Sequence, residues 1–343
     1  MIRREFLGGA FLGTTMAAAA SAQAGAKPKF GIDVFSLRSQ GWSPFEYLDY
    51  VKRQGAHVCF FSEIRFLGGL EAGHLKKVRE HAAGLGLELE IGNRSICPSS
   101  KAFDAAAGAA EEQLTRLLEA ASIVGSKVVR CFLGTMADRP NLERCIGDTV
   151  AVLRKVRTRA MDAGVKIAVE NHAGDMQARE LKGLIEAAGK EFVGACIDSG
   201  NATWTLEDPH LTLETLAPYC VTSGVRDSQL WRVPEGVAMR WVRMGEGNVD
   251  IGPWVKKYVE LCPGKTMALE IIVLPQPRVF AFMEQKFWEA YRGVPAWEFS
   301  RFLALAEKGK PSPGAPVPKE MAIQKEREDL EASAAFTRQI LKL

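Results

Sequence analysis

Lys166-Ile-Ala-Val-Glu-Asn-His172 is a short apolar run that ends in a carboxylate, and Val193-Gly-Ala-Cys-Ile-Asp-Ser-Gly-Asn201 repeats this pattern after a helical segment. Neither run alternates strictly between apolar and polar residues. Continuous apolar runs of this length are typical of strands buried on both faces of a parallel sheet. The two stretches therefore predict consecutive parallel strands, each ending in an acidic side chain.

The same unit recurs along the chain. Amphipathic segments of helical period separate the apolar runs, and Ser43-Pro44 with Glu46 is a typical helix start. No G-x-G-x-x-G follows the first strand, so the usual signature of a dinucleotide-binding sheet is missing. Eight units within about 270 residues predict a closed α/β fold, a (β/α)8 TIM barrel with a C-terminal helical extension. The predicted strands are 30–36, 57–62, 87–92, 127–133, 166–170, 193–198, 221–226 and 266–272.

Three segments divide the 343 residues. Residues 1–24 contain paired arginines, Arg3 and Arg4, then an apolar small-residue run and an A-x-A cleavage site, which resembles a twin-arginine export signal. We therefore expect an exported protein, periplasmic or secreted, with no stable membrane insertion after the signal is removed. Residues 25–309 form the predicted barrel. Residues 310–343 form a proline-rich linker and a charged helix, whose apolar residues could pack on the barrel or on a second subunit of a homo-oligomer.

Composition excludes several classes of protein. The chain has 44 basic and 41 acidic residues, a net charge of +3, and no basic stripe, so no nucleic-acid partner is expected. Its seven cysteines are odd in number and form no C-x-x-C pair. Several lie in apolar strand-like runs, where cysteine acts as a small hydrophobic residue, so a disulfide framework is not expected.

Acidic side chains mark the ends of three predicted strands. Functional residues of such barrels lie at the C-terminal ends of the strands, which places Glu170, Asp198 and Glu270 at one mouth. Burying three like charges is costly unless a cation compensates them. Carboxylate oxygens suit hard divalent metals, so the trio predicts a metal site.

Four motifs carry a family resemblance over about residues 29–305. They are Ala168-Val-Glu170-Asn-His172, Cys196-Ile-Asp198-Ser-Gly-Asn201, Gly245-Glu-Gly247-Asn-Val-Asp250 and Ala268-Leu-Glu270. In order and strand spacing they resemble the xylose isomerase-like TIM barrels, the sugar phosphate isomerase/epimerase superfamily. The resemblance implies a divalent metal (Mn, Mg, Co or Zn) held by Glu170, Asp198, the residue at position 224, and Glu270.

Position 224 departs from the family pattern. Relatives commonly have His-x-x-Asp there, whereas this chain has Gly224-Val-Arg226-Asp227, and glycine offers no ligand. Three alternatives remain open. The three carboxylates could hold the metal with waters; His172 could supply the imidazole; or the site could be metal-free, with Arg226, Arg130 or Arg278 balancing the carboxylates. Loss of the histidine by itself leaves the acidic cluster intact, so a metal is the favoured alternative.

The resemblance also implies a chemistry. Glu170 and Glu270 match the paired glutamates that move a proton beside the carbonyl of a bound sugar, while a metal stabilises the enediolate. The predicted function is thus an isomerase/epimerase-like enzyme acting on a small-molecule carbohydrate. Alternatives are a 3-keto-glycoside lyase or hydrolase, a DNA-repair endonuclease of the same superfamily, which export and the lack of a basic face disfavour, and a non-catalytic carbohydrate-binding barrel that lost its metal.

Further polar residues at the same mouth are candidates for substrate binding. The long excursion over 228–250 is a candidate lid or wall, and one of Trp204, Trp231 and Trp241 is expected to contact the sugar. Arg226 could equally pair with Asp198. The predicted substrate-binding residues are His172, Asn201, Arg226, Asp227, Glu63, Arg130 and Glu246.

Overall fold

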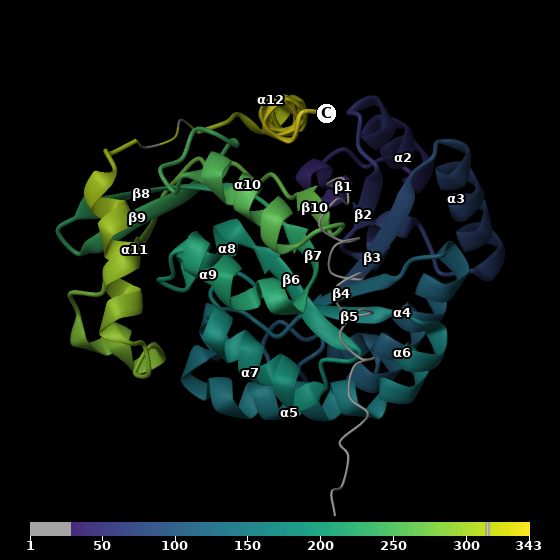
Figure 1. Ribbon diagram of the computed structural model, residues 1–343, viewed down its shortest axis with the longest axis horizontal. Helices are drawn as coiled ribbons and strands as arrows, with labels where there is room; N and C mark the ends of the chain where they lie inside the picture. Colours follow the sequence, from purple (N-terminus) through teal and green to yellow (C-terminus); the bar gives the residue numbers. More distant parts are fainter. Residues whose placement is uncertain (1–28, 313, 315) are drawn as a thin grey trace, which may run out of the picture.

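The eight predicted strands form one parallel sheet that closes on itself (Figure 1). The computed structural model describes residues 29–312, 314 and 316–343, so the predicted export signal lies outside the described residues. The strand order is β10-β1-β2-β3-β4-β5-β6-β7, and Val225 N donates to Ala268 O at 2.7 Å to join the last pair. The strands are β1 Lys29–Asp33, β2 Val58–Phe61, β3 Glu88–Ser95, β4 Val128–Phe132, β5 Lys166–Glu170, β6 Val193–Asp198, β7 Cys220–Gly224 and β10 Thr266–Leu269.

Helices surround this sheet and confirm the α/β barrel (Figure 1). Ser43 caps the first of them with a capping box to Glu46, as its sequence predicts. The helices are α2 Pro44–Arg53, α3 Ala72–Gly84, α4 Ala110–Val124, α5 Leu142–Lys155, α6 Arg157–Ala163, α7 Ala178–Ala188, α8 Ser199–Trp204, α9 Pro209–Leu216, α10 Ile251–Leu261, α11 Ala296–Lys308 and α12 Lys319–Leu341. Short 3-10 turns are η1 Val34–Leu37, η2 Ile64–Leu67, η3 Ala105–Ala107, η4 Met136–Asn141, η5 Ala217–Tyr219 and η6 Gln285–Ala290.

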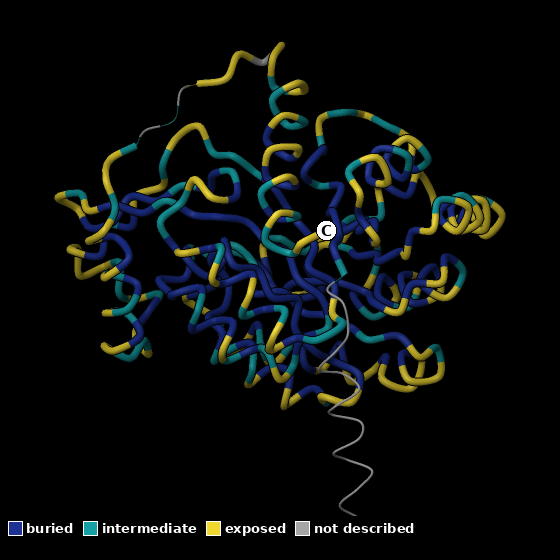
Figure 2. Tube along the Cα trace, turned by 45° about the horizontal axis from the view of Figure 1, so that its top comes forward, coloured by how far each residue is buried: buried dark blue, intermediate teal, exposed yellow. Residues whose placement is uncertain are grey.

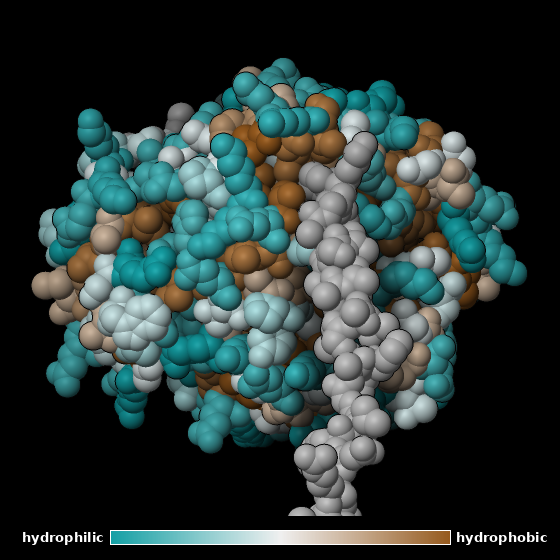
Figure 3. Space-filling model, in the orientation of Figure 1, coloured by the Kyte–Doolittle hydropathy of each residue, from teal (hydrophilic) through white to brown (hydrophobic). Residues whose placement is uncertain are grey.

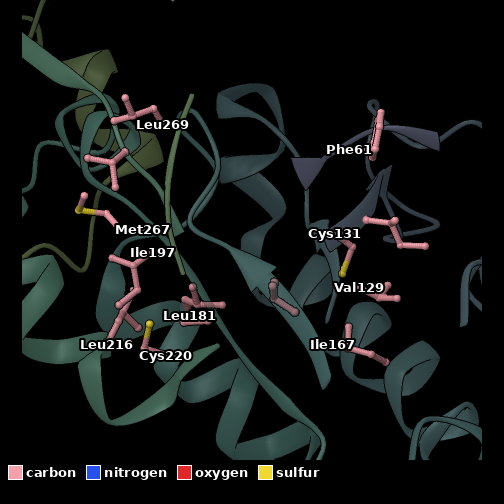
Figure 4. Close-up of a cluster of buried hydrophobic side chains, with 14 of the residues drawn as sticks. Phe61, Val129, Cys131, Ile167, Leu181, Ile197, Leu216, Cys220, Met267 and Leu269 are labelled. Carbon is pink, nitrogen blue, oxygen red and sulfur yellow. The ribbon is translucent and has the colours of Figure 1, made fainter. Parts of the chain in front are cut away.

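Strand residues alternate between two environments. One set, including Ile167 and Val169, packs outward against the helices and forms the main apolar core. Figure 2 shows that the strands are mostly buried, and Figure 4 shows Ile167 among other side chains of this core. The other set faces the barrel interior, where Val128, Ala168 and Cys196 form a small separate cluster. Because side chains alternate along a strand, the residues two places after these three point to the same interior. They are Arg130, Glu170 and Asp198, so the alternation carries charged groups to the barrel mouth.

All seven cysteines are buried and free of disulfides. Cys131 and Cys220 lie among apolar side chains of the core (Figure 4). This placement agrees with the prediction that cysteine serves here as a small hydrophobic residue. In the described part of the chain, no helix is long and apolar enough to cross a membrane. Hydrophilic side chains cover most of the face shown in Figure 3.

The excursion over 228–250 is a β-hairpin beside the barrel. Strands β8 Asp227–Val233 and β9 Gly236–Val242 pair antiparallel, and β11 Arg278–Phe280 adds a third strand. Helix α11 packs on this small sheet, away from the barrel (Figure 1). One side chain of the hairpin, Trp241, reaches the barrel mouth and donates from Nε1 to Gly200 O at 3.0 Å. The hairpin is therefore a wall of the mouth.

Helix α12 packs on the barrel beside α10 and η1 (Figure 1). Leu330 and Ala334 are buried in the core, and Tyr50 of α2 donates to Glu331 at 2.7 Å. The C-terminal helix thus fills the space between α10 and α2, where the helix after the last barrel strand is expected. The segment directly after that strand forms η6 and α11 instead.

Candidate active site

Three carboxylates meet at the barrel mouth. Glu170 and Asp198 are the last residues of β5 and β6, and Glu270 directly follows β10. One oxygen from each lies within 4.8 Å of the others, and all three side chains are buried. The sequence predicts this convergence, because parallel strands that end in carboxylates bring them to one edge.

Glu170 is held by two neighbours. Arg130 of β4 pairs with Oε2, and Asn201 Nδ2 donates to Oε1 at 2.8 Å. Burial favours the neutral carboxyl, but the charge and the hydrogen bond of Arg130, with a smaller contribution from the charge of Arg226, outweigh it, so the pKa of Glu170 is lowered. Glu170 therefore loses its proton at a lower pH than an ordinary glutamate.

Asp198 and Glu270 share one partner, Arg226. Nη2 of this arginine pairs with Oδ2 of Asp198 and lies 2.5 Å from Oε2 of Glu270. For both carboxyls burial is the largest effect and exceeds the opposing attraction of Arg226. The pKa of Asp198 is raised to about 8, and that of Glu270 is also raised. The two therefore hold protons more readily than Glu170 does.

His172 lies beside the trio as a neutral imidazole. Its Nδ1 is 2.8 Å from Gly134 O, and since a carbonyl only accepts, Nδ1 carries the proton. The ring stacks on Phe132 with 3.8 Å between centroids. Burial lowers the pKa of His172 to about 4, with the charge of Glu170 opposing this effect. Among the described residues, the group of possible ligand atoms within 4.8 Å of one another contains the three carboxylates and not His172.

The mouth contains a cavity of about 280 Å³. The predicted residues Glu63, Arg130, His172, Asn201, Arg226 and Glu270 line it. Glu170 is not among the lining residues, but its carboxylate bonds to two that are, Arg130 and Asn201. The sequence does not predict eight other lining residues, several of which come from segments distant in the sequence: Phe35, Ser62, Arg94, Ala102, Phe132, Thr135, Ala173 and Ile272.

Two predicted residues lie elsewhere. Asp227 Oδ2 accepts from the backbone N–H groups of Gly245 and Gly247, at 2.9 Å each, so it holds the turn after β9. Glu246 is exposed on that turn, away from the cavity. Among the predicted tryptophans, Trp241 lines the cavity. The family-like motif Gly245-Glu-Gly247 is thus a structural turn that Asp227 anchors.

We tested the trio as a divalent metal site. The spacing of its oxygens would allow a single ion to contact all three carboxylates. However, Arg130 and Asn201 already take both oxygens of Glu170, Arg226 pairs with the other two carboxylates, and Gly224 supplies no ligand. As these side chains stand, a divalent ion does not fit among them.

Solved structures and a curated protein resemble this chain. A D-psicose 3-epimerase in the presence of D-fructose aligns with 91% of this chain and 99% of its own, at 15% identity and a TM-score of 0.61. An L-ribulose 3-epimerase aligns with 92% of this chain and 95% of its own, at 15% identity and a TM-score of 0.58. Both similarities establish the fold.

A similar curated protein is the 3-oxo-isoapionate decarboxylase of Pectobacterium atrosepticum, which is 24% identical over 180 residues. That alignment covers 52% of this chain and 59% of the decarboxylase, so the chain spans less than two thirds of that relative. The sequence pattern described as "xylose isomerase-like TIM barrel" matches residues 48–261. Since this match covers more than half of the sequence, the chain belongs to the xylose isomerase-like TIM barrel family.

Proposed function

We propose that the chain is an isomerase/epimerase-like enzyme that transfers a proton beside the carbonyl of a sugar. One observation carries this proposal: Glu170 and Glu270 lie in one site with pKa values displaced in opposite directions. Two carboxyls that differ in this way can act as a base and an acid at the same pH. The enzymes named among the similar proteins add support, since epimerisation beside a carbonyl and decarboxylation of a 3-oxo acid both place negative charge on a carbonyl oxygen.

The proposed reaction has two proton transfers. A substrate that enters between Arg130 and Asn201, the cavity-lining partners of Glu170, gives the proton of the carbon next to its carbonyl to a free lone pair of ionised Glu170. The electron pair of that C–H bond moves to the carbonyl oxygen to give an enediolate. Glu270 then returns a proton to the opposite face of that carbon, or to the neighbouring carbon. Arg130 and Arg226 line the cavity and would stabilise the enediolate by donating hydrogen bonds.

Exchange of substrate hydrogen with solvent deuterium tests this function. A panel of free ketoses and 3-keto-glycosides in D₂O should include a compound that gains deuterium beside its carbonyl, as followed by NMR. Glu270→Gln and Glu170→Gln should each lower that exchange by about 10²–10⁴-fold, the usual contribution of a general acid or base. Glu246→Gln is the matched control, because Glu246 is exposed and away from the cavity. Binding of a sugar with no exchange or turnover would favour the non-catalytic barrel.

Cleavage of a keto-glycoside is a second candidate, favoured by a second cavity. This space of about 200 Å³ adjoins the first, and Glu63 and Arg94 line both. It could hold the group linked to the reacting sugar. After proton removal beside the 3-keto group, the bond from C1 to the glycosidic oxygen would break, and the leaving oxygen would take a proton from Glu270.

Narrowing the second cavity separates the two candidates. Leu70 lines only that cavity, so Leu70→Trp should slow cleavage of a 3-keto-glycoside by more than about 10-fold while deuterium exchange into a free keto-sugar stays unchanged. Leu70→Met is the control, because it changes the volume little. Equal effects of Leu70→Trp on both substrates would argue against a separate subsite.

A further inference from the structure

Arg226 lies where a metal would be expected. Its Nη2 contacts Asp198 and Glu270, two of the three carboxylates that the family resemblance assigns to the metal. Position 224, where the family resemblance expects the fourth metal ligand, lies next to the same two carboxylates. A Cβ on Gly224 would lie 3.1 Å from Asp198 Oδ2 and 3.2 Å from Glu270 Oε2, the two oxygens that pair with Arg226. Glycine at 224 therefore leaves open the space around these oxygens.

The chain is shaped to seat this arginine. A Cβ on Gly200 would lie 2.1 Å from Cγ and 2.5 Å from Cδ of Arg226, so only glycine leaves room for its aliphatic stem. The guanidinium carbon lies 4.3 Å from the ring centroid of Trp241, in a cation–π contact. Trp241 is in turn fixed by its hydrogen bond to Gly200 O. Gly224, Gly200 and Trp241, which lie on separate elements, thus together accommodate the buried side chain of Arg226.

The seated guanidinium keeps a free donor. Among the described residues, Arg226 Nε is buried and has no hydrogen-bond partner, although the side chain lines the cavity. Buried donors are normally paired, so an unpaired one beside a cavity indicates a missing acceptor. An enediolate oxygen has the negative charge and lone pairs that such a donor takes.

We propose that Arg226 permanently replaces the divalent metal in this chain. Its guanidinium contacts Asp198 and Glu270 in the place of the ion, and its N–H groups stabilise the oxyanion that a metal would otherwise hold. Arginine stays protonated at every working pH and its planar fork matches paired oxygens, so it can serve as a fixed cation. The catalytic part of this inference rests on the proposed function, whereas the absence of metal binding does not.

Metal binding without substrate tests the replacement. Isothermal titration of the chelator-treated protein with MnCl₂ should show no stoichiometric Mn²⁺ binding for the wild type. The double variant Gly224→His with Arg226→Ala should gain it, because it restores the fourth ligand and removes the competing cation. Adding Asp198→Asn to that double variant should abolish the gain. Stoichiometric Mn²⁺ on the wild type, by titration or by elemental analysis of the purified protein, overturns the proposal even if every variant misfolds.

Turnover supplies the second readout. The wild-type rate should be unchanged by EDTA, while Arg226→Ala should lower it by about 10²–10³-fold and Arg226→Lys by less, since lysine keeps the charge and loses the fork. Arg301→Ala is the matched control and should keep the wild-type rate, because Arg301 pairs with Asp208 and lies outside the cavity. A wild-type rate lost to EDTA and restored by Mn²⁺ contradicts the replacement and leaves the proposed proton transfer intact. If the wild type exchanged no deuterium and also bound no Mn²⁺ in the titration, the result would contradict the proposed function and leave the replacement of the metal intact.

Discussion

Gly200 and Arg226 occupy one small space, so a single methyl group tests how firmly the arginine is seated. Gly200→Ala should lower the free energy of unfolding by about 1–3 kcal/mol, because the new Cβ overlaps the buried stem of Arg226. Gly183→Ala is the matched control. It lies in helix α7 with nothing within 4 Å of its Cβ, and should raise stability by about 0.5–1 kcal/mol. Urea unfolding of both variants measures the difference. Equal stability of Gly200→Ala and the wild type would mean that Arg226 is not tightly held.

Residues at strand ends could be predicted from the sequence, and their partners could not. Glu170, Asp198 and Glu270 each end an apolar run, so strand alternation and parallel order bring them together. Whether Arg226 pairs with a carboxylate or binds a ligand depends on Gly200 and Trp241, which belong to other elements of the fold and contact its side chain. For the same reason the sequence predicts Asp227 as a substrate-binding residue, whereas in the structure its carboxylate holds the turn at Gly245 and Gly247. Such contacts arise only when distant segments fold together.

Helix α12 is expected to stabilise the barrel through one buried side chain. Leu330 is fully buried against the barrel, so Leu330→Ala should lower the free energy of unfolding by about 2–5 kcal/mol through lost burial and a residual cavity. Ile323→Ala is the matched control on the same helix. Ile323 is 45% exposed, and its replacement should change stability by less than about 0.5 kcal/mol. Urea denaturation measures both. A Leu330→Ala variant as stable as Ile323→Ala would show that α12 contributes little to the fold.

Elements with strong periodic patterns were predictable, and those defined by packing were not. Each of the eight predicted strands overlaps an observed one, because continuous apolar runs mark buried parallel strands. The hairpin of β8 and β9 was expected only as a long excursion, since its residues pack partly on α11 and partly on the mouth. The sequence does not decide whether α12 packs on the barrel or on a partner subunit, because an apolar stripe does not identify the surface that covers it.

At the scale of the whole molecule, the closed barrel follows from the number and order of its units. Closure itself, through Val225 and Ala268, is a contact between the seventh strand and the last. Export remains a prediction that rests on residues 1–24. The charged groups buried inside the barrel, in contrast, could not be predicted from the sequence. Carboxyl groups are buried within the fold as well as at its mouth, and they include Asp33, Glu90, Asp175 and Glu207.

One of these buried carboxyls, Glu207, is expected to contribute less stability as pH rises towards neutrality. Burial raises the pKa of Glu207 from 4.5 to about 7, against opposing hydrogen bonds from Thr212 and Ala178. As pH rises between these two values, the unfolded chain releases this proton before the folded chain does. The stabilisation present below the unfolded pKa is therefore lost, by up to about 3 kcal/mol for this group.

Glu207→Gln isolates this contribution. Glutamine keeps the shape and can still accept from Ala178 N, but it does not titrate, so unfolding free energy should fall less steeply between about pH 5 and pH 8 than in the wild type. Glu214→Gln, at a half-exposed pair with Lys257, should leave the wild-type slope unchanged. Urea unfolding at several pH values gives the three slopes. Parallel slopes for Glu207→Gln and the wild type would mean that Glu207 is ionised in the folded protein, and its burial would then require a cation or water that compensates the charge.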